Sequence, residues 1–586
     1  MKKIFSILLA GFAMVSCVDT VILPDNKTID EDFWQTKSEV EAVMGSAYAQ
    51  LRTAECVRNM IIWGDFRSDE LVVTSDLRAT DKYYNDLQQM YSFNYVTESP
   101  FNTWAPFYSA INYCNLVLEK AEGVMAIDPN YMPGDYQANR AQALALRAFC
   151  YFYLTRVFHD IPVTPHAYLN SSDDLNVPQS TPDSVLTMCI EDLKEAYSYA
   201  VPGNTYAKIE GEEWRDKAFL NKDGISAVLA DIYLWRGSIN RDGNDYQACI
   251  EWCDSVIAAK KRAYEANPKQ SMGRRPGMGQ NQFEPQDYYL STYENMYNDI
   301  FVNQNADESI FELQFRRSNN FANTGLTEMY YNLTGSYGCL KASKPFGTQN
   351  GSANSDAVWK NNVDLRFYEY LFNAGEAIDQ FNVRKFVASQ SRVLSQSSDL
   401  SAASAPDRNR SVAFPPTWIF YRLTDVMLMK AEALVQLYNM GGKGADDTRN
   451  EEAFEICRFI NSRALSEDNK GMELKYSVYQ NSMEELVLQE RARELCFEGK
   501  RWYDLMRYNY RHTDTQADLT KKLTEKYVNS NYSGFYDLAL RKYTAASAMR
   551  VKMRDERYLY MPIAQDEIEL NSSLNQNPVY KSSAKY

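Results

Sequence analysis

The sequence predicts a mainly α fold, a tetratricopeptide-like helical superhelix frame with large loop-rich insertions that carry the ligand site. Apolar residues recur at three- and four-residue spacing in many segments, which is the periodicity of helices with one buried face. Small residues share these stripes with large ones, as in helix–turn–helix repeats whose helices pack closely. Long stretches rich in Asn, Ser, Gly, Pro and Tyr interrupt the pattern.

The first helix is expected shortly after residue 33, where apolar residues from 40 to 51 follow helical spacing. Thr36 can cap it, with Glu39 three residues later completing a capping box. In segment 138–157 the small residues Ala141, Ala145 and Ala148 form one narrow stripe. The other predicted helices cover 104–122, 182–199, 222–236, 246–260, 421–437, 451–464 and 482–497.

We predict one domain over residues 33–586 with insertions at about 69–100, 273–362 and 372–416. Loops of this length in a folded protein are usually functional or disordered. Their aromatic content favours function, because disordered segments are poor in aromatic residues.

The N-terminus predicts export. Lys2 and Lys3 precede an apolar stretch at 4–15 that is too short to span a membrane and has the length of a signal peptide core. Ser16 and Cys17 follow, which resembles a lipobox, so we predict a signal peptide at 1–16, acylation of Cys17 and a flexible tether at 17–32. The alternative is an ordinary signal peptide that contains a cysteine.

The composition limits the class of partner. The formal net charge of −15 argues against nucleic acid and against an anionic membrane surface. Aromatic residues make up 13% of the 586 residues, with 42 Tyr. Tyrosine has an apolar face and a polar tip, which suits a hydrated recognition surface.

The residues that usually carry catalysis and metal binding are sparse. Only three histidines occur, which weakens schemes based on a catalytic His. Cys249 and Cys253 lie one helical turn apart, but no second Cys pair or His cluster completes a zinc site. We therefore expect them to be buried small hydrophobes, and we expect no metal site and no cofactor. Carboxylates at 69–86 could hold calcium, but they lack EF-hand spacing.

The segment 482–507 is dense in charge and predicts a helix with local ion pairs. Ser482 and Glu485 have the spacing of a capping box. Glu498 with Arg501, and Asp504 with Arg507, have the spacing of helical ion pairs. Gly499 predicts a helix end or bend.

A catalytic interpretation of the same segment would make Glu490 and Glu494 an acid/base pair, as in a glycosidase. Nearby arginines would keep both carboxylates ionised, so we favour structural ion pairs.

Five stretches resemble the SusD/RagB family of surface lipoproteins. They are FWQTKSEVEAVMGSAY at 33–48, RAQALALRAFCYFYLTRVFHDIPVT at 140–164, YRLTDVMLMKAEAL at 421–434, LVLQERARELCFEGKRWYDLMRY at 486–508 and YLYMPIAQDEIELNSSLNQNPVY at 558–580. His159 stands where the family has Gly in its Gly-Asp-Ile/Val-Pro turn, and Met561 departs from the closing motif.

The resemblance implies a non-catalytic protein that captures an oligosaccharide or polysaccharide and delivers it to a SusC-like TonB-dependent outer-membrane transporter. It would be lipid-anchored in the outer membrane through Cys17 and face the cell exterior. Some members of the family resemble peptide-import partners, so a peptide- or protein-binding lipoprotein remains the alternative. A glycosidase is the third hypothesis.

Aromatic rings stack on sugar rings while planar polar groups bind the hydroxyls. Two regions carry that mixture, 63–86 and 288–337 with Trp359 nearby, and the family's ligand contacts typically come from loops there. The candidate residues are Tyr83, Tyr84 and Trp359 as stacking platforms, Tyr289 and Tyr331 behind them, and Asp65, Arg67, Arg78 and Asn85 as polar contacts. The alternative places Trp63 and Phe66 in the core and leaves loop Asp and Arg residues merely solvated.

Overall fold

The computed structural model describes residues 33–580 apart from internal gaps. The gaps are 170–175, 208, 268–271, 274–288, 293–294, 316–321, 331–337, 350–355, 361–362, 373–377, 389–390, 392–415, 442–445, 466, 515–516 and 526–532. The predicted signal peptide, Cys17, the tether and Tyr331 lie outside the described residues.

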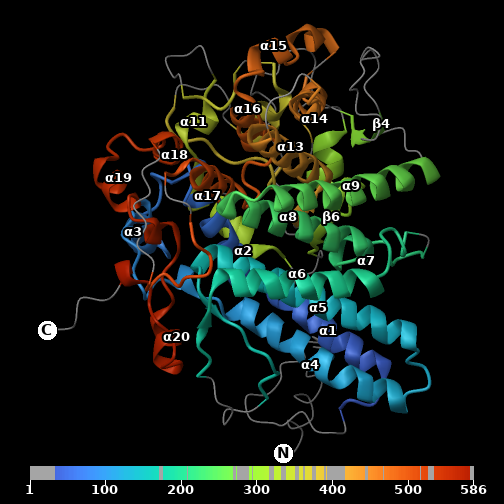
Figure 1. Ribbon diagram of the computed structural model, residues 1–586. Helices are drawn as coiled ribbons and strands as arrows, with labels where there is room; N and C mark the ends of the chain where they lie inside the picture. The colour runs from blue at the N-terminus through green and yellow to red at the C-terminus, as the bar shows by residue number, and fades with distance from the viewer. Residues whose placement is uncertain are drawn as a thin grey trace, which may run out of the picture.

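Long helices packed side by side form the frame, which confirms the prediction of a mainly α, tetratricopeptide-like fold. Consecutive members contact one another, from α1 against α4 up to α13 against α14, and Figure 1 shows them stacked in layers. The frame helices are α1 (Lys37–Leu51), α4 (Ala105–Ile127), α5 (Pro133–Phe158), α6 (Pro182–Tyr199), α8 (Lys222–Asn240), α9 (Gly243–Ala266), α13 (Leu423–Met440) and α14 (Arg449–Arg463).

The sequence signals for these helices are confirmed in detail. The Glu39 carboxylate accepts the N–H of Thr36 at 2.7 Å, as the capping box at the start of α1 predicts. The alanine stripe of α5 is fully buried against its neighbours, since small side chains let helices approach closely. Cys249 and Cys253 are free and buried in α9, as predicted for small hydrophobes.

Shorter elements complete the described part of the chain. The helices are α2 (Ala54–Ile61), α3 (Tyr84–Tyr91), α7 (Arg215–Ala218), α10 (Thr324–Tyr330), α11 (Lys344–Gly347), α12 (Leu365–Tyr370), α15 (Tyr476–Tyr479), α16 (Met483–Glu494), α17 (Arg501–His512), α18 (Ser533–Ala539), α19 (Ser547–Met553) and α20 (Gln565–Leu570). Two π-helices occupy Ile62–Phe66 and Asn298–Val302, and 3-10 turns occupy Pro100–Asn102, Glu467–Met472, Glu556–Leu559 and Pro578–Tyr580.

Four antiparallel strand pairs join distant segments. They are β1 (Leu71–Val73) with β7 (Leu340–Ala342), β2 (Ile161–Pro162) with β3 (Gln179–Ser180), β4 (Met272–Gly273) with β5 (Leu290–Ser291), and β6 (Ser309–Leu313) with β8 (Trp418–Arg422).

The predicted helix 421–437 begins late, because β8 occupies its first two residues and α13 starts at Leu423. The run Trp418, Ile419, Phe420, Tyr421 consists of aromatic and β-branched residues, which favour a strand. All of β8 is buried, with Leu313 opposite Trp418 in the pair with β6.

The predicted capping box before α16 is wrong. Ser482 is the N-cap of α16, but its side chain makes no capping hydrogen bond. Gly499 lies in the bend between α16, which ends at Glu494, and α17, with φ +73°, which confirms the predicted bend.

A buried network of ion pairs surrounds Glu494 at the centre of the molecule. The Glu494 carboxylate accepts hydrogen bonds from Arg366 at 2.8 Å and from Arg422 at 2.6 Å, and it also pairs with Arg463. Arg366 reaches Glu490 at 2.7 Å as well. None of the side chains of Glu490, Glu494 and Arg366 has measurable exposure.

The partners in this network are mostly distant in sequence, which corrects the predicted ladder of local pairs. Asp504 and Arg507 do pair, at 2.7 Å. Glu498 instead contacts Lys385 and Arg422, and Arg501 contacts Asp69, so the predicted Glu498–Arg501 pair is wrong. Helical spacing identifies neighbours on one helix but cannot show which other segments press against it.

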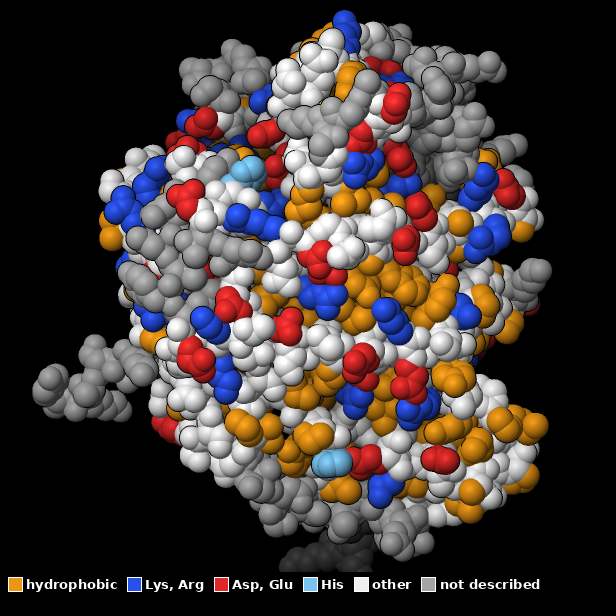
Figure 2. Space-filling model, in the orientation of Figure 1, with side chains coloured by type: hydrophobic (Ala, Val, Ile, Leu, Met, Phe, Trp, Pro, Cys, Tyr) orange, Lys and Arg blue, Asp and Glu red, His pale blue; other side chains and the backbone are white. Residues whose placement is uncertain are grey.

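Within the described residues, no helix is long and apolar enough to cross a membrane. On the face in Figure 2, basic and acidic side chains are interspersed with apolar ones.

Candidate functional site

Pairing of β1 with β7 brings three distant segments to one exposed surface. Leu71 lies opposite Ala342, and Ala342 bridges in turn to Phe381. Beyond the buried Thr74 and Ser343 that directly follow these strands, Ser75, Asp76 and Lys344 are polar and exposed. We give the name β1–β7 surface to the exposed and partly exposed residues of segments 74–85, 340–344 and 379–380, together with Lys341.

Side-chain contacts fix the β1–β7 surface internally. The Gln380 amide accepts from the Ser75 N–H at 2.9 Å and donates to the Val73 carbonyl at 3.1 Å. Lys341 donates to Asp76 at 2.8 Å. These contacts tie loop 74–78 to the other two segments.

The charged groups on this surface remain accessible. Lys344 pairs with Asp379 at 2.9 Å, and their side chains are 55% and 81% exposed. The Asp76 side chain is 70% exposed, and its hydrogen bond and charge interaction with Lys341 lower its pKa. Exposed pairs of this kind contribute little to stability, so their side chains can rearrange to bind a ligand at small cost.

Helix α3 adds aromatic and amide groups at the border of the same surface, because it packs against β1. Tyr84 is half-buried and Asn85 is exposed at the start of α3. Arg78 is exposed, and its backbone N–H donates to Asp81 at 2.7 Å. The predicted residues Arg78, Tyr84 and Asn85 therefore belong to the loop and the helix that border the polar groups described above.

Tyr83 lies beneath this surface, not on it. It is 9% exposed and has φ +70° as the N-cap of α3. Its ring packs against Phe101, and the Lys82 ammonium lies 4.6 Å from its centroid. Tyr83 thus supports the loop and offers a ligand little ring surface.

Three predicted contact residues lie in the core, which corrects their assignment. Trp359 has no exposed surface and donates its indole N–H to the Phe346 carbonyl at 2.6 Å. Arg67 is 2% exposed and donates to the Leu559 carbonyl at 2.5 Å. Asp65 is fully buried. The alternative that Trp63 and Phe66 are core residues is correct, since both are buried.

Tyr289 lies elsewhere in the molecule. Its ring stacks on Tyr264 of α9 with centroids 4.0 Å apart. Tyr289 directly precedes β5, which pairs with β4. In Figure 1, α9 and β4 lie on the right, whereas α3 lies on the left. Tyr289 is therefore not part of the β1–β7 surface.

Sequence reasoning missed Asp76, Lys341, Lys344, Asp379 and Gln380. Each is a common polar residue in an irregular segment, and only the β1–β7 pairing brings them together. No spacing in the sequence predicts that pairing, because it joins residues near 72 to residues near 341.

Asp65 has a structural role in a buried carboxyl pair with Glu70. Both Asp65 oxygens accept the Gly499 N–H at 2.9 Å, and Glu70 accepts the Phe497 N–H at 3.0 Å. Burial raises the pKa of Asp65 to about 7, although the Gly499 N–H lowers it. Burial, followed by the nearby charge of Asp65, raises the pKa of Glu70 well above its usual value.

The Asp65 pKa predicts how stability depends on pH. A carboxyl with a raised pKa in the folded state stabilises the fold below its unfolded pKa, and this contribution is lost as the pH rises through the folded pKa. We therefore expect the free energy of unfolding to fall between about pH 4 and about pH 7, and Asp65→Asn to make this fall at least twofold smaller. Urea unfolding at several pH values between about 4 and about 7 measures this fall. Asp537→Asn is the control, because the Asp537 side chain is exposed. Equal slopes for the two variants would contradict the assignment.

The described residues contain no group of three or more His, Cys, Asp or Glu side chains placed to hold a metal ion. Glu490 and Glu494 are fully buried in ion pairs, so no substrate reaches them in this structure, which argues against the glycosidase hypothesis at this pair.

Two family models match the chain. One, described as the SusD family, matches residues 176–580, and another, described as starch-binding and associating with the outer membrane, matches residues 23–234. The chain belongs to the SusD family. Among SusD-like relatives, SusD-like protein P38 of Formosa agariphila is 26% identical over 527 residues, covering 86% of this chain and 90% of that protein.

Solved SusD superfamily structures share the fold. One from Bacteroides thetaiotaomicron has a TM-score of 0.62 at 22% identity and covers 94% of this chain and 99% of its own. One from Bacteroides fragilis has a TM-score of 0.62 at 18% identity, covering 94% and 100%. A Bacteroides vulgatus structure described as a putative sugar binding protein has a TM-score of 0.59 at 19% identity, covering 93% and 99%.

Proposed function

We propose that this SusD-family protein captures an oligosaccharide or polysaccharide at the outer membrane and delivers it, without catalysis, to a SusC-like TonB-dependent transporter. In this proposal Cys17 carries the lipid anchor and the protein faces the cell exterior. Support comes from the starch-binding and outer-membrane description of the matching family model and from the fold shared with a putative sugar binding protein.

The β1–β7 surface carries the proposal, because its chemistry suits a hydroxylated ligand. It combines the half-buried ring of Tyr84 with the exposed groups of Arg78 and Asn85, next to the Lys341–Asp76 pair. Amide, guanidinium and carboxylate groups bind sugar hydroxyls in pairs, while an aromatic face packs on the C–H face of the ring. A solvent-exposed surface also suits a long chain that extends beyond the protein.

Binding by the purified protein without residues 1–17 tests the proposal. We expect retardation in native gels that contain a polysaccharide recognised by the protein, from a panel of α-glucans, β-glucans, mannans and xylans. Tyr84→Ala and Arg78→Ala should each weaken binding about fivefold or more, since a lost stacking or hydrogen-bonding contact costs about 1 kcal/mol.

The controls are Tyr199→Ala, whose residue is 48% exposed at the end of α6, and Arg554→Ala, whose residue is exposed after α19. Both should bind as the wild type does. Retardation by no polysaccharide, together with binding of peptide mixtures, would overturn the proposal in favour of a peptide carrier. Release of reducing sugars from a bound polysaccharide would overturn its non-catalytic part.

A further inference from the structure

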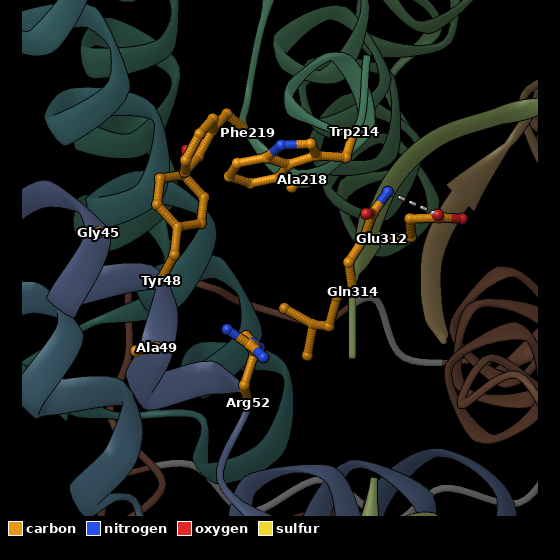
Figure 3. A pocket seen from close by; sticks show the side chains of 10 residues that line it. Gly45, Tyr48, Ala49, Arg52, Trp214, Ala218, Phe219, Glu312 and Gln314 are labelled. Carbon is orange, nitrogen blue, oxygen red and sulfur yellow. Dashed lines mark hydrogen bonds between the residues drawn. The ribbon is translucent and has the colours of Figure 1, made fainter. Parts of the chain in front are cut away.

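A cavity lies in the helical frame, between α1, α7 and β6 (Figure 3). Its volume is about 310 Å³. Tyr48, Phe219 and Trp214 contribute aromatic rings, and Arg52 and Gln314 contribute polar groups. We call this cavity the α1–α7 pocket. Trp214, Phe219, Arg52 and Gln314 are each partly exposed, so the pocket is accessible from solvent.

The aromatic residues form one continuous wall. The Tyr48 and Phe219 rings meet edge to face with centroids 4.8 Å apart, and Phe219 and Trp214 follow at 5.5 Å. Tyr48 is further held by its hydroxyl, which accepts the Leu220 N–H at 3.0 Å. The rings are thus fixed by one another and by the backbone.

Polar groups lie opposite this wall. Arg52 is the C-cap of α1, and its guanidinium lies 5.5 Å from the centroid of the Phe315 ring. The Gln314 amide donates to Glu312 at 3.1 Å, which leaves its carbonyl oxygen available as an acceptor (Figure 3). Glu312 also accepts from Ser309 at 2.7 Å and from the Asn305 N–H at 2.9 Å, so its carboxylate is already hydrogen-bonded within the protein.

Gly45 is the position on α1 from which the cavity can be filled. It lies inside α1 and lines the pocket, where Ala would stabilise the helix by up to about 1 kcal/mol. Its φ is not positive, and a Cβ at this position would meet no atom within 4 Å. Neither backbone conformation nor helix packing requires Gly here. The effect of having no side chain at this position is to keep space open in the pocket.

The chemistry of the lining indicates the class of ligand. A fully apolar ligand would bury the polar groups of the lining without offering them hydrogen bonds, which is costly. A ligand with one apolar face and hydroxyl groups at its edge can pack against the aromatic wall and form hydrogen bonds with the polar groups opposite. The volume is at the small end of the range for small-molecule pockets, roughly 300–1,000 Å³.

We propose that the α1–α7 pocket is a second saccharide-binding site, which holds one or two sugar rings of the cargo. The class of ligand in this inference rests on the proposed function, whereas the location of the site does not. In Figure 1, α3 of the β1–β7 surface lies on the left and α7 on the right, so the two sites are separate. A long glycan bound at both would dissociate more slowly than one bound at either, because the second contact becomes intramolecular.

Filling the pocket from Gly45 tests the inference. Gly45→Leu places a side chain in the cavity, and Gly123→Leu is the matched control, since Gly123 is a helical glycine of α4 that also has no atom near its missing Cβ. Thermal unfolding of both variants confirms that they fold. Calorimetric titration with defined disaccharides and hexasaccharides of the glycans in the panel above gives affinity and stoichiometry.

We expect two disaccharides per chain for the wild type and for Gly123→Leu, and one for Gly45→Leu, with at least tenfold weaker binding at the blocked site. Tyr84→Ala should affect only the other site. Equal titrations for the two glycine variants would overturn the second site while leaving the proposed function intact. A wild type that binds no saccharide would overturn both the second site and the proposed function. If Gly45→Leu keeps its saccharide binding but loses binding of aromatic peptides that the wild type binds, the class of ligand proposed for the pocket would be wrong.

Discussion

Replacement of Glu494 by Gln is expected to lower the free energy of unfolding by about 3–5 kcal/mol, because it removes one partner from a buried ion-pair network. Glu494 is fully buried and contacts the guanidinium groups of Arg366, Arg422 and Arg463. Gln keeps the shape of the side chain but cannot balance these charges. Urea unfolding followed by tryptophan fluorescence measures the change.

Lowering the pH should show the same contribution of Glu494 to the stability of the wild type. Burial alone would raise the pKa of Glu494, but Arg463, Arg422 and Arg366 together lower it well below its usual value. A carboxyl with a depressed folded pKa contributes stability above its unfolded pKa, and this contribution is lost as the pH falls toward the folded pKa. The loss should begin below about pH 4.5 and be much smaller in Glu494→Gln.

Glu485→Gln is the matched control, because Glu485 lies on the same helix and is exposed. Its free energy of unfolding should stay within about 0.5 kcal/mol of the wild type. A Glu494→Gln variant as stable as this control would show that the ion pairs around Glu494 contribute little to the fold.

Gly64→Ala is expected to destabilise the protein by several kcal/mol, or to prevent folding. Gly64 lies in the π-helix Ile62–Phe66, and a Cβ there would lie 2.2 Å from the Gly499 carbonyl oxygen. The obstructing atoms are backbone, so no side chain can move to make room. The backbone segments must separate instead, which would disturb the hydrogen bonds that the Gly499 N–H donates to the Asp65 carboxylate.

Gly123→Ala is expected to change the stability in the opposite direction, since a Cβ on Gly123 meets no neighbour within 4 Å. This variant should be more stable by up to about 1 kcal/mol, the usual gain from Gly to Ala inside a helix. Thermal unfolding of both variants separates a helix-propensity effect from a steric one. A Gly64→Ala protein with the wild-type midpoint would contradict the close approach to Gly499.

The sequence was sufficient to predict the helical frame because each helix carries its own periodicity. Helix α6 matches the predicted range 182–199, and the alanine stripe of α5 is buried as expected. The last two residues of strand β8 were assigned to the start of a helix, since a short apolar run fits either structure.

The site was predicted only in part, for a physical reason. Arg78, Tyr84 and Asn85 are near one another in sequence, so their segment could be selected by composition. Whether an aromatic residue of a loop faces solvent depends on what packs beneath it, and Trp359 and Tyr83 proved to be covered. Trp214 was not selected at all, because the segment between α6 and α8 has no unusual composition.

The network around Glu494 also limits which chain segments can be exchanged between related proteins. Arg366 and Lys385 belong to the segment between β7 and β8, yet each forms buried contacts with residues at the end of α16 or just after it. A segment swapped from a relative would introduce unmatched buried charges unless it carried the equivalent basic residues. Diversification of binding specificity is therefore expected to proceed by substitution in the exposed loops, and replacement of whole insertions is expected only where the basic residues are transferred with them.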